Sequence, residues 1–165
     1  MELKGKENQV LPSDIAKYFL SQAINDGELI SPLKMQKLVY YAYVWYLVLT
    51  GKRLFAEPIE AWAMGPVTPS LYGDLKIYGS APIPEAYLGN KADTDEIFVK
   101  LKNQTEVLRG VYEKYDTLTA FELVVLTHNE KPWVEARKGL KPEEQSNKPI
   151  ADSDIISFYQ QKEFK

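Results

Sequence analysis

Few side chains in this sequence could do chemistry, and the single histidine, His128, limits the options most. The chain has no cysteine, which excludes disulfides, thiolate zinc sites and thiol nucleophiles. A Ser-His-Asp triad would have to use His128, and no G-x-S-x-G motif presents a serine for attack. We therefore expect a protein that is not an enzyme and that has no metal site.

The other ionisable residues form no catalytic or cofactor-binding pattern. Adjacent acids such as Glu143-Glu144 and Asp95-Glu96 lie in charged stretches, and such stretches are usually solvated surface. Neither G-x-x-x-x-G-K-[ST] nor G-x-G-x-x-G occurs, so no loop of known type would hold nucleotide phosphates. The net charge of −3 argues against DNA or RNA as a partner. The sequence thus predicts a protein without cofactors.

The element that positions most of the aromatic side chains is a predicted helix between Ser31 and Gly51. Ser31 stands at the N-cap, Pro32 at the first helical position, and Gly51 just past the end. Residues 38–49 are apolar or aromatic on every face, which predicts a buried helix at the centre of the fold. This run is too short for a membrane span, which needs about twenty such residues.

The rest of the chain predicts a mainly α, compact single domain over residues 1–165, with its core roughly at 13–159. A small β element is expected near residues 59–67, and residues 80–94 are expected to be a long loop. Thr119 and Glu122 form a capping box in front of a helix that should stop near His128. Further helices are expected over residues 13–25 with Ser13 as its cap, 69–78, 107–115, 132–138, and at 152–159 with Asp152 or Ser153 as its cap.

The aromatic content is high, with 11 Tyr, 3 Trp and 6 Phe. Aromatic side chains have a large contact area, and those of Tyr and Trp also carry a polar group, which suits both cores and protein interfaces. The interpretation that most of these residues fill the core is favoured over the interpretation that they form a protein interface. The first nine residues are charged and lack the apolar region of a signal peptide, so we expect a cytoplasmic protein.

The stretch Ser31–Ala42 resembles the opening of the Panacea, or SocA-like, antitoxin domain. A second block, Leu126–Trp133, resembles the Thr-His-x-x-x-Pro-Trp element of that family. The resemblance covers roughly Ser13 to Tyr159, and the ordered series of motifs makes it specific. The intervening matches are Gly51–Phe55, Pro58–Val67, Pro69–Tyr72 and Tyr78-Gly79.

The resemblance implies a bacterial or phage antitoxin, encoded beside a toxin that it neutralises by direct protein–protein binding. The toxins paired with such antitoxins include alarmone-synthetase-like enzymes. One branch is similar to a protease adaptor, which implies an alternative function: delivery of the toxin to a AAA+ protease. A phage-encoded regulatory binding protein is the other alternative. A small toxic reading frame beside the gene would favour the antitoxin.

Six residues are candidates for contact with the partner. Within the predicted central helix, two lysines are the only charged residues and share a stripe with a tyrosine, and a charge reversal at Lys37 is expected to leave the fold intact. Of the other candidates, Trp62 lies next to the Gly65-Pro66 turn, and Tyr72 and His128 belong to the blocks that match the family. Each could equally be a core group with an internal hydrogen-bond partner, an interpretation favoured for His128. The candidates are Lys34, Lys37, Tyr41, Trp62, Tyr72 and His128.

Overall fold

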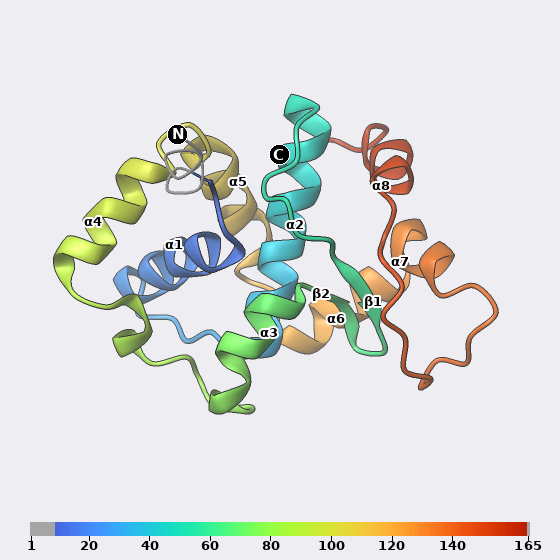
Figure 1. Cartoon of the computed structure of the whole chain (residues 1–165), viewed down its shortest axis with the longest axis horizontal. Coiled ribbons are helices and arrows are strands. Elements are labelled where there is room, and N and C mark those ends of the chain that lie inside the picture. Colours follow the sequence, from blue (N-terminus) through green and yellow to red (C-terminus); the bar gives the residue numbers. More distant parts are fainter. Residues whose placement is uncertain (1–8, 165) are drawn as a thin grey trace, which may run out of the picture.

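The computed structural model describes residues 9–164 and has a mainly α fold with one small antiparallel sheet, as the sequence predicts (Figure 1). Residues 1–8, which carry most of the segment used to argue against a signal peptide, lie outside the described residues. The α-helices are α1 (Pro12–Asn25), α2 (Pro32–Thr50), α3 (Pro69–Leu75), α4 (Lys91–Lys100), α5 (Thr105–Tyr115), α6 (Ala120–His128), α7 (Lys131–Ala136) and α8 (Asp152–Tyr159). Two 3-10 helices, η1 (Lys76–Tyr78) and η2 (Glu85–Leu88), and the strands β1 (Glu60–Trp62) and β2 (Gly65–Val67) complete the elements.

Helix α2 is the centre of the molecule, and the other elements pack around it (Figure 1). The Ser31 hydroxyl accepts a hydrogen bond from the backbone N–H of Lys34, and Gly51 ends the helix with a φ of 73°. Every residue from 35 to 45 is buried, which confirms the predicted central helix. Helices α1, α5, α6 and α8 and strand β2 all contact it. Within residues 9–164, no helix has the length and apolar character needed to cross a membrane.

The predicted β element is a short hairpin whose outer edge is covered by a later segment. Strands β1 and β2 pair antiparallel, with Trp62 opposite Gly65. On the other side of β1, the N–H of Ala61 donates to the carbonyl oxygen of Lys148, and the N–H of Ile150 donates to that of Ile59, each at 2.8 Å. Residues 148–150 are therefore tied to the hairpin although they lie more than eighty positions later in the chain.

The predicted long loop over residues 80–94 is wrong. Helix η2 and the start of α4 occupy most of residues 85–94. The Asn90 side chain accepts a hydrogen bond from the N–H of Asp93, and the Asp93 carboxylate accepts one from the N–H of Asn90. Helix α4 buries no residue fully, so its sequence shows no apolar period, and the capping box was its only signal.

Helix α1 begins one residue before the predicted start. Leu11 occupies the N-cap position, and its N–H donates to the carboxylate of Asp14 at 2.8 Å. Ser13 lies inside the first turn and does not cap the helix. Asp14 captures the free amide because its side chain reaches back over the first turn, a role that a hydroxyl inside the helix cannot fill.

The capping box of α6 is confirmed, whereas the cap of α8 is not. The N–H of Thr119 donates to Glu122 Oε2 at 2.7 Å, and the N–H of Glu122 donates to Thr119 Oγ1 at 3.1 Å. In α8 the N-cap position is held by Ala151, so neither Asp152 nor Ser153 caps that helix. The Asp152 carboxylate instead accepts a hydrogen bond from the Tyr43 hydroxyl, which ties α8 to α2.

Candidate partner-binding groove

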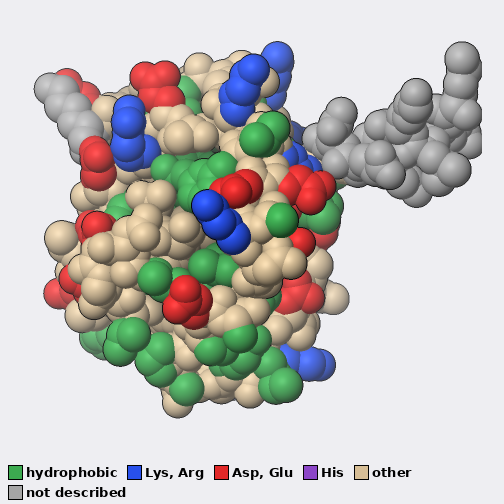
Figure 2. Space-filling model, turned by 90° about the vertical axis from the view of Figure 1, so that its left-hand side faces the viewer, with side chains coloured by type: hydrophobic (Ala, Val, Ile, Leu, Met, Phe, Trp, Pro, Cys, Tyr) green, Lys and Arg blue, Asp and Glu red, His purple; other side chains and the backbone are tan. Residues whose placement is uncertain are grey.

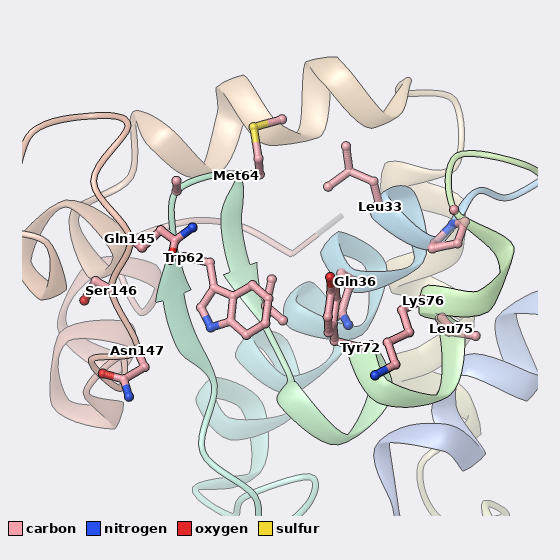
Figure 3. Close-up of a pocket in the computed structure, with 14 residues that line it drawn as sticks. Leu33, Gln36, Trp62, Met64, Tyr72, Leu75, Lys76, Gln145, Ser146 and Asn147 are labelled. Atoms are coloured by element: carbon pink, nitrogen blue, oxygen red, sulfur yellow. The ribbon is translucent and has the colours of Figure 1, made fainter.

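A groove of about 850 Å³ opens beside the hairpin, and Figure 3 shows the residues that line it. The hairpin and the first turns of α2 form its floor, α3 with η1 forms one side, and residues 145–147 form the other. Most of its surface is apolar, which is the usual character of a site that binds another molecule. The lining residues are Pro32, Leu33, Gln36, Trp62, Ala63, Met64, Val67, Tyr72, Leu75, Lys76, Gly79, Gln145, Ser146 and Asn147.

The apolar part of this groove is built around Trp62 and Tyr72. Their rings meet edge to face, with centroids 4.9 Å apart and an angle of 62° between the planes. The indole N–H of Trp62 donates to Glu60 Oε1 at 2.9 Å, which fixes the ring along the strand. Tyr72 is 46% exposed and Met64, in the hairpin turn, is 53% exposed. These three side chains therefore present apolar surface to the solvent.

The polar margin of the groove consists of one fixed amide and several free groups. Gln36 is buried, and its side-chain amide is fixed because it donates to the carbonyl oxygen of Thr68 and accepts from the N–H of Thr68. Lys76 is exposed and forms no ion pair with any residue that the structure describes. Gln145 and Asn147 are exposed, and their side chains make no hydrogen bond within residues 9–164.

Beneath the groove, Lys37 is fully buried and anchors the hairpin to α2. Its Nζ donates to the carbonyl oxygen of Pro66 at 3.1 Å, and burial lowers the pKa of this amino group to about 7. Gly65 lies directly against it with a φ of 104°, and a Cβ there would approach Lys37 Cε to 2.6 Å and Thr127 Oγ1 to 2.9 Å. Only glycine fits this turn, because a side chain would strain the backbone and clash with Lys37.

His128 is half-buried at the end of α6 and stacks on Trp133 of α7. The ring centroids are 3.9 Å apart and the planes are nearly parallel, at 13°. Burial lowers the pKa of the imidazole, and the nearby charge of Lys37 lowers it further. The Trp133 N–H donates to the carbonyl oxygen of Trp62 at 2.9 Å. The ring is therefore neutral near pH 7, and the stack joins α6 and α7 to the hairpin.

Tyr41 lies in the core, in a polar cluster around a buried carboxylate. Its hydroxyl and that of Tyr159 both donate to Glu130 Oε1, at 2.5 Å and 2.7 Å. The Tyr41 ring stacks on Tyr115 with centroids 4.1 Å apart. Burial raises the pKa of Glu130, whereas the two hydroxyl donors lower it. This cluster connects α2, α5 and α8 to the N-cap of α7.

Lys34 is partly buried in the first turn of α2. Its Nζ donates to the carbonyl oxygen of Asp116, at the end of α5, at 2.5 Å. Burial lowers the pKa of this amino group, and the negative charges of Asp116 and Glu28 raise it. Lys34 thus holds the chain between α5 and α6 against the start of the central helix.

Comparison of the chain with known proteins gives one match. The family model described as "Antitoxin SocA-like, Panacea domain" matches residues 35–134, which is more than half of the chain. The chain belongs to this family. No curated protein and no solved structure gives a significant match. The family description indicates an antitoxin role.

The part matched by the Panacea-domain model runs from α2 to the middle of α7, so it includes the hairpin and α3. Of the six candidate residues, the structure brings Trp62 and Tyr72 together in the groove. Lys37 and Tyr41 have no exposed surface, so a partner could touch them only after the fold opens. The expectation that Lys37 is a surface charge is wrong, because β2 covers it.

Sequence analysis missed several groove residues of this Panacea domain. Met64 lies between two hairpin strands, and an apolar residue in a two-residue turn is a signal for an exposed side chain that was not used. Leu33, Lys76, Gln145 and Asn147 gave no such signal, because only the fold brings them beside the hairpin. In residues 9–164, no three His, Asp or Glu side chains are grouped closely enough to hold a metal ion.

Proposed function

We propose that this Panacea-domain protein is the antitoxin of a toxin–antitoxin pair and neutralises its toxin by direct binding, with the groove as the main contact. The observation that carries the proposal is the open apolar groove built on α2, α3 and the hairpin, most of which lies within the family match. A contiguous exposed apolar patch on a protein surface marks an interaction site. Cytoplasmic toxins, such as alarmone-synthetase-like enzymes, are the class of partner expected from the family resemblance.

The side chains of the groove have the character of binding hot spots. A few aromatic or cationic anchors supply most of the energy of a protein interface, and they act best in desolvated pockets. Trp62 and Tyr72 provide two such rings in fixed contact, and Met64 provides a flexible apolar side chain elsewhere in the same groove. The hydrogen bond from Trp62 to Glu60 holds the indole in place before a partner arrives.

A stable interface buries about 800 Å² on each partner, which is more than the groove alone provides. Helix α6 packs against β2 and offers further apolar surface. Its inner face buries Leu123 and Val124, while on its outer face Phe121 is 70% exposed and Val125 is 43% exposed. A helix that is apolar on both faces needs a second covering surface. We propose that the toxin covers this face together with the groove.

The face of the molecule that carries α4 is a weaker candidate. Figure 2 shows that side, where charged side chains of both signs lie among the apolar ones. Lys100 and Asp14 form an ion pair between α4 and α1, with Nζ and Oδ2 2.7 Å apart. The polar groups there would have to lose water on binding without gaining partners, which makes such a surface costly to cover.

The test is co-expression of the chain with the toxin encoded beside its gene, in cells with and without the AAA+ protease. Direct neutralisation predicts that growth is restored in both strains. Restoration that requires the protease would support the adaptor function instead. If growth is not restored in either strain although both proteins accumulate, the antitoxin proposal is wrong.

A further inference from the structure

We infer that the groove binds an extended segment of the toxin in which an apolar side chain is flanked by a carboxylate. The inference rests on the proposed function, because it names what part of the toxin the groove accepts. It follows from three separate features of the groove: its apolar floor, its free side-chain amides and its single cation.

The floor accepts an apolar side chain. Trp62 and Tyr72 form a fixed aromatic corner, and Met64, in the hairpin turn, lines another part of the same groove (Figure 3). The thioether of methionine is flexible and adapts to side chains of different shape. A volume of about 850 Å³ holds a few residues of peptide but not a folded element of several turns.

The amides of Gln145 and Asn147 suit a peptide main chain. Each amide carries a donor and an acceptor, the same pair that an extended peptide unit presents. Neither is used within residues 9–164, and Figure 3 shows both on the side of the groove opposite Tyr72 and Lys76. The adjoining residues 148–150 are fixed to β1 by backbone hydrogen bonds, so these amides stand on a supported segment.

The charge of the groove favours an acidic neighbour. Lys76 is the one charged residue among those that line it, and no Asp or Glu is among them. Because Lys76 forms no ion pair in the described part of the chain, its ammonium group is available to a carboxylate of the partner. Complementary charge of this kind selects the partner segment and its orientation more than it adds affinity. A lysine or arginine at the same place in the partner would be repelled.

The first experiment locates the segment by photo-crosslinking in the purified complex of the chain with its neighbouring toxin. Tyr72→p-benzoylphenylalanine places the probe in the groove, and Val99→p-benzoylphenylalanine, on the exposed side of α4, is the control. We expect the Tyr72 probe to label one toxin segment that contains an Asp or Glu beside an apolar residue. Labelling from Val99 only, or a labelled segment without a carboxylate, would overturn the inference.

The second experiment tests the charge pairing by titration calorimetry. Lys76→Glu should weaken binding about three- to tenfold, because an exposed ion pair becomes a repulsion, whereas Lys76→Arg should bind as the original chain does. Replacing the carboxylate of the labelled toxin segment by Lys should restore binding to the Lys76→Glu variant. If Lys76→Glu forms a complex with the toxin and its affinity is unchanged, the inference is refuted although the proposed function stands. If no complex forms with any variant, the proposed function itself fails.

Discussion

The amino group of Lys37 in the central helix donates a hydrogen bond to the carbonyl oxygen of Pro66 in β2, 3.1 Å away. Both atoms lie in the interior, where a hydrogen bond is not weakened by competition with water. The hairpin that carries Trp62 and Met64 is therefore fixed to the most buried helix of the molecule. The floor of the groove is formed before any partner binds.

The burial of Lys37 predicts a pH dependence of stability. Its pKa is lowered from 10.5 to about 7 in the folded chain, so between these values the unfolded chain binds a proton that the folded chain does not. The free energy of unfolding should then rise with pH, by at most about 1.4 kcal/mol per unit. Urea unfolding at pH 7 and pH 9 should show a rise of about 2 kcal/mol beyond that of Lys37→Met. If the free energy of unfolding changes equally with pH in the original chain and in Lys37→Met, Lys37 is not buried.

The substitution Gly65→Ala should destabilise the fold by about 3 kcal/mol, from backbone strain and the clash with Lys37 together. The matched control is Gly51→Ala, because Gly51 also has a positive φ but has no atom within 4 Å of the added Cβ. Gly51→Ala should lower the free energy of unfolding by about 1 kcal/mol. Thermal unfolding of both variants measures the difference. Equal losses would show that the contact with Lys37 does not restrict the turn.

The cluster around Glu130 predicts that Tyr41→Phe affects stability and not partner binding. The change removes a donor from a buried carboxylate, which should cost about 2 kcal/mol. Tyr72→Phe is the control, because that hydroxyl has no hydrogen bond within residues 9–164 and the side chain is exposed. Its stability should change by less than about 0.5 kcal/mol. A Tyr41→Phe variant that folds as well as the original but binds the toxin more weakly would contradict this assignment.

The groove predicts which surface substitution abolishes neutralisation. Met64→Lys places a charge on its apolar floor and should weaken toxin binding at least about thirtyfold, the effect of losing a central hot spot. Val99→Lys makes the same change at an exposed apolar residue of α4, and it should bind normally. Circular dichroism checks that both variants fold. Equal binding by the two variants would exclude the groove as the main contact.

Local signals in the sequence were sufficient to predict several of the helices. Ser31, Pro32 and Gly51 predicted α2 because capping chemistry is decided within one turn. The box of Thr119 and Glu122 predicted α6 for the same reason. Helix α4 was missed because its residues are mostly exposed, so burial left no period in the sequence.

The site was less predictable because it depends on contacts between distant residues. Lys34, Lys37 and Tyr41 do lie along one stripe of the helix. No local pattern, however, shows that β2 covers Lys37 and that α8 covers Tyr41. A lysine is almost always at the surface, and here the hydrogen bond to the carbonyl oxygen of Pro66 and the lowered pKa of the amino group make a buried one tolerable. Gln145 and Asn147 join the groove through the pairing of residues 148–150 with β1, which no local signal indicates.

Direct neutralisation requires a stable complex of the two proteins. Size-exclusion chromatography with light scattering of the purified chain and its purified toxin, without any protease, detects such a complex. We expect one species that contains both proteins, and a complex with Trp62→Ala that dissociates about thirtyfold more readily. Two separate species, under conditions in which co-expression restores growth, would contradict it.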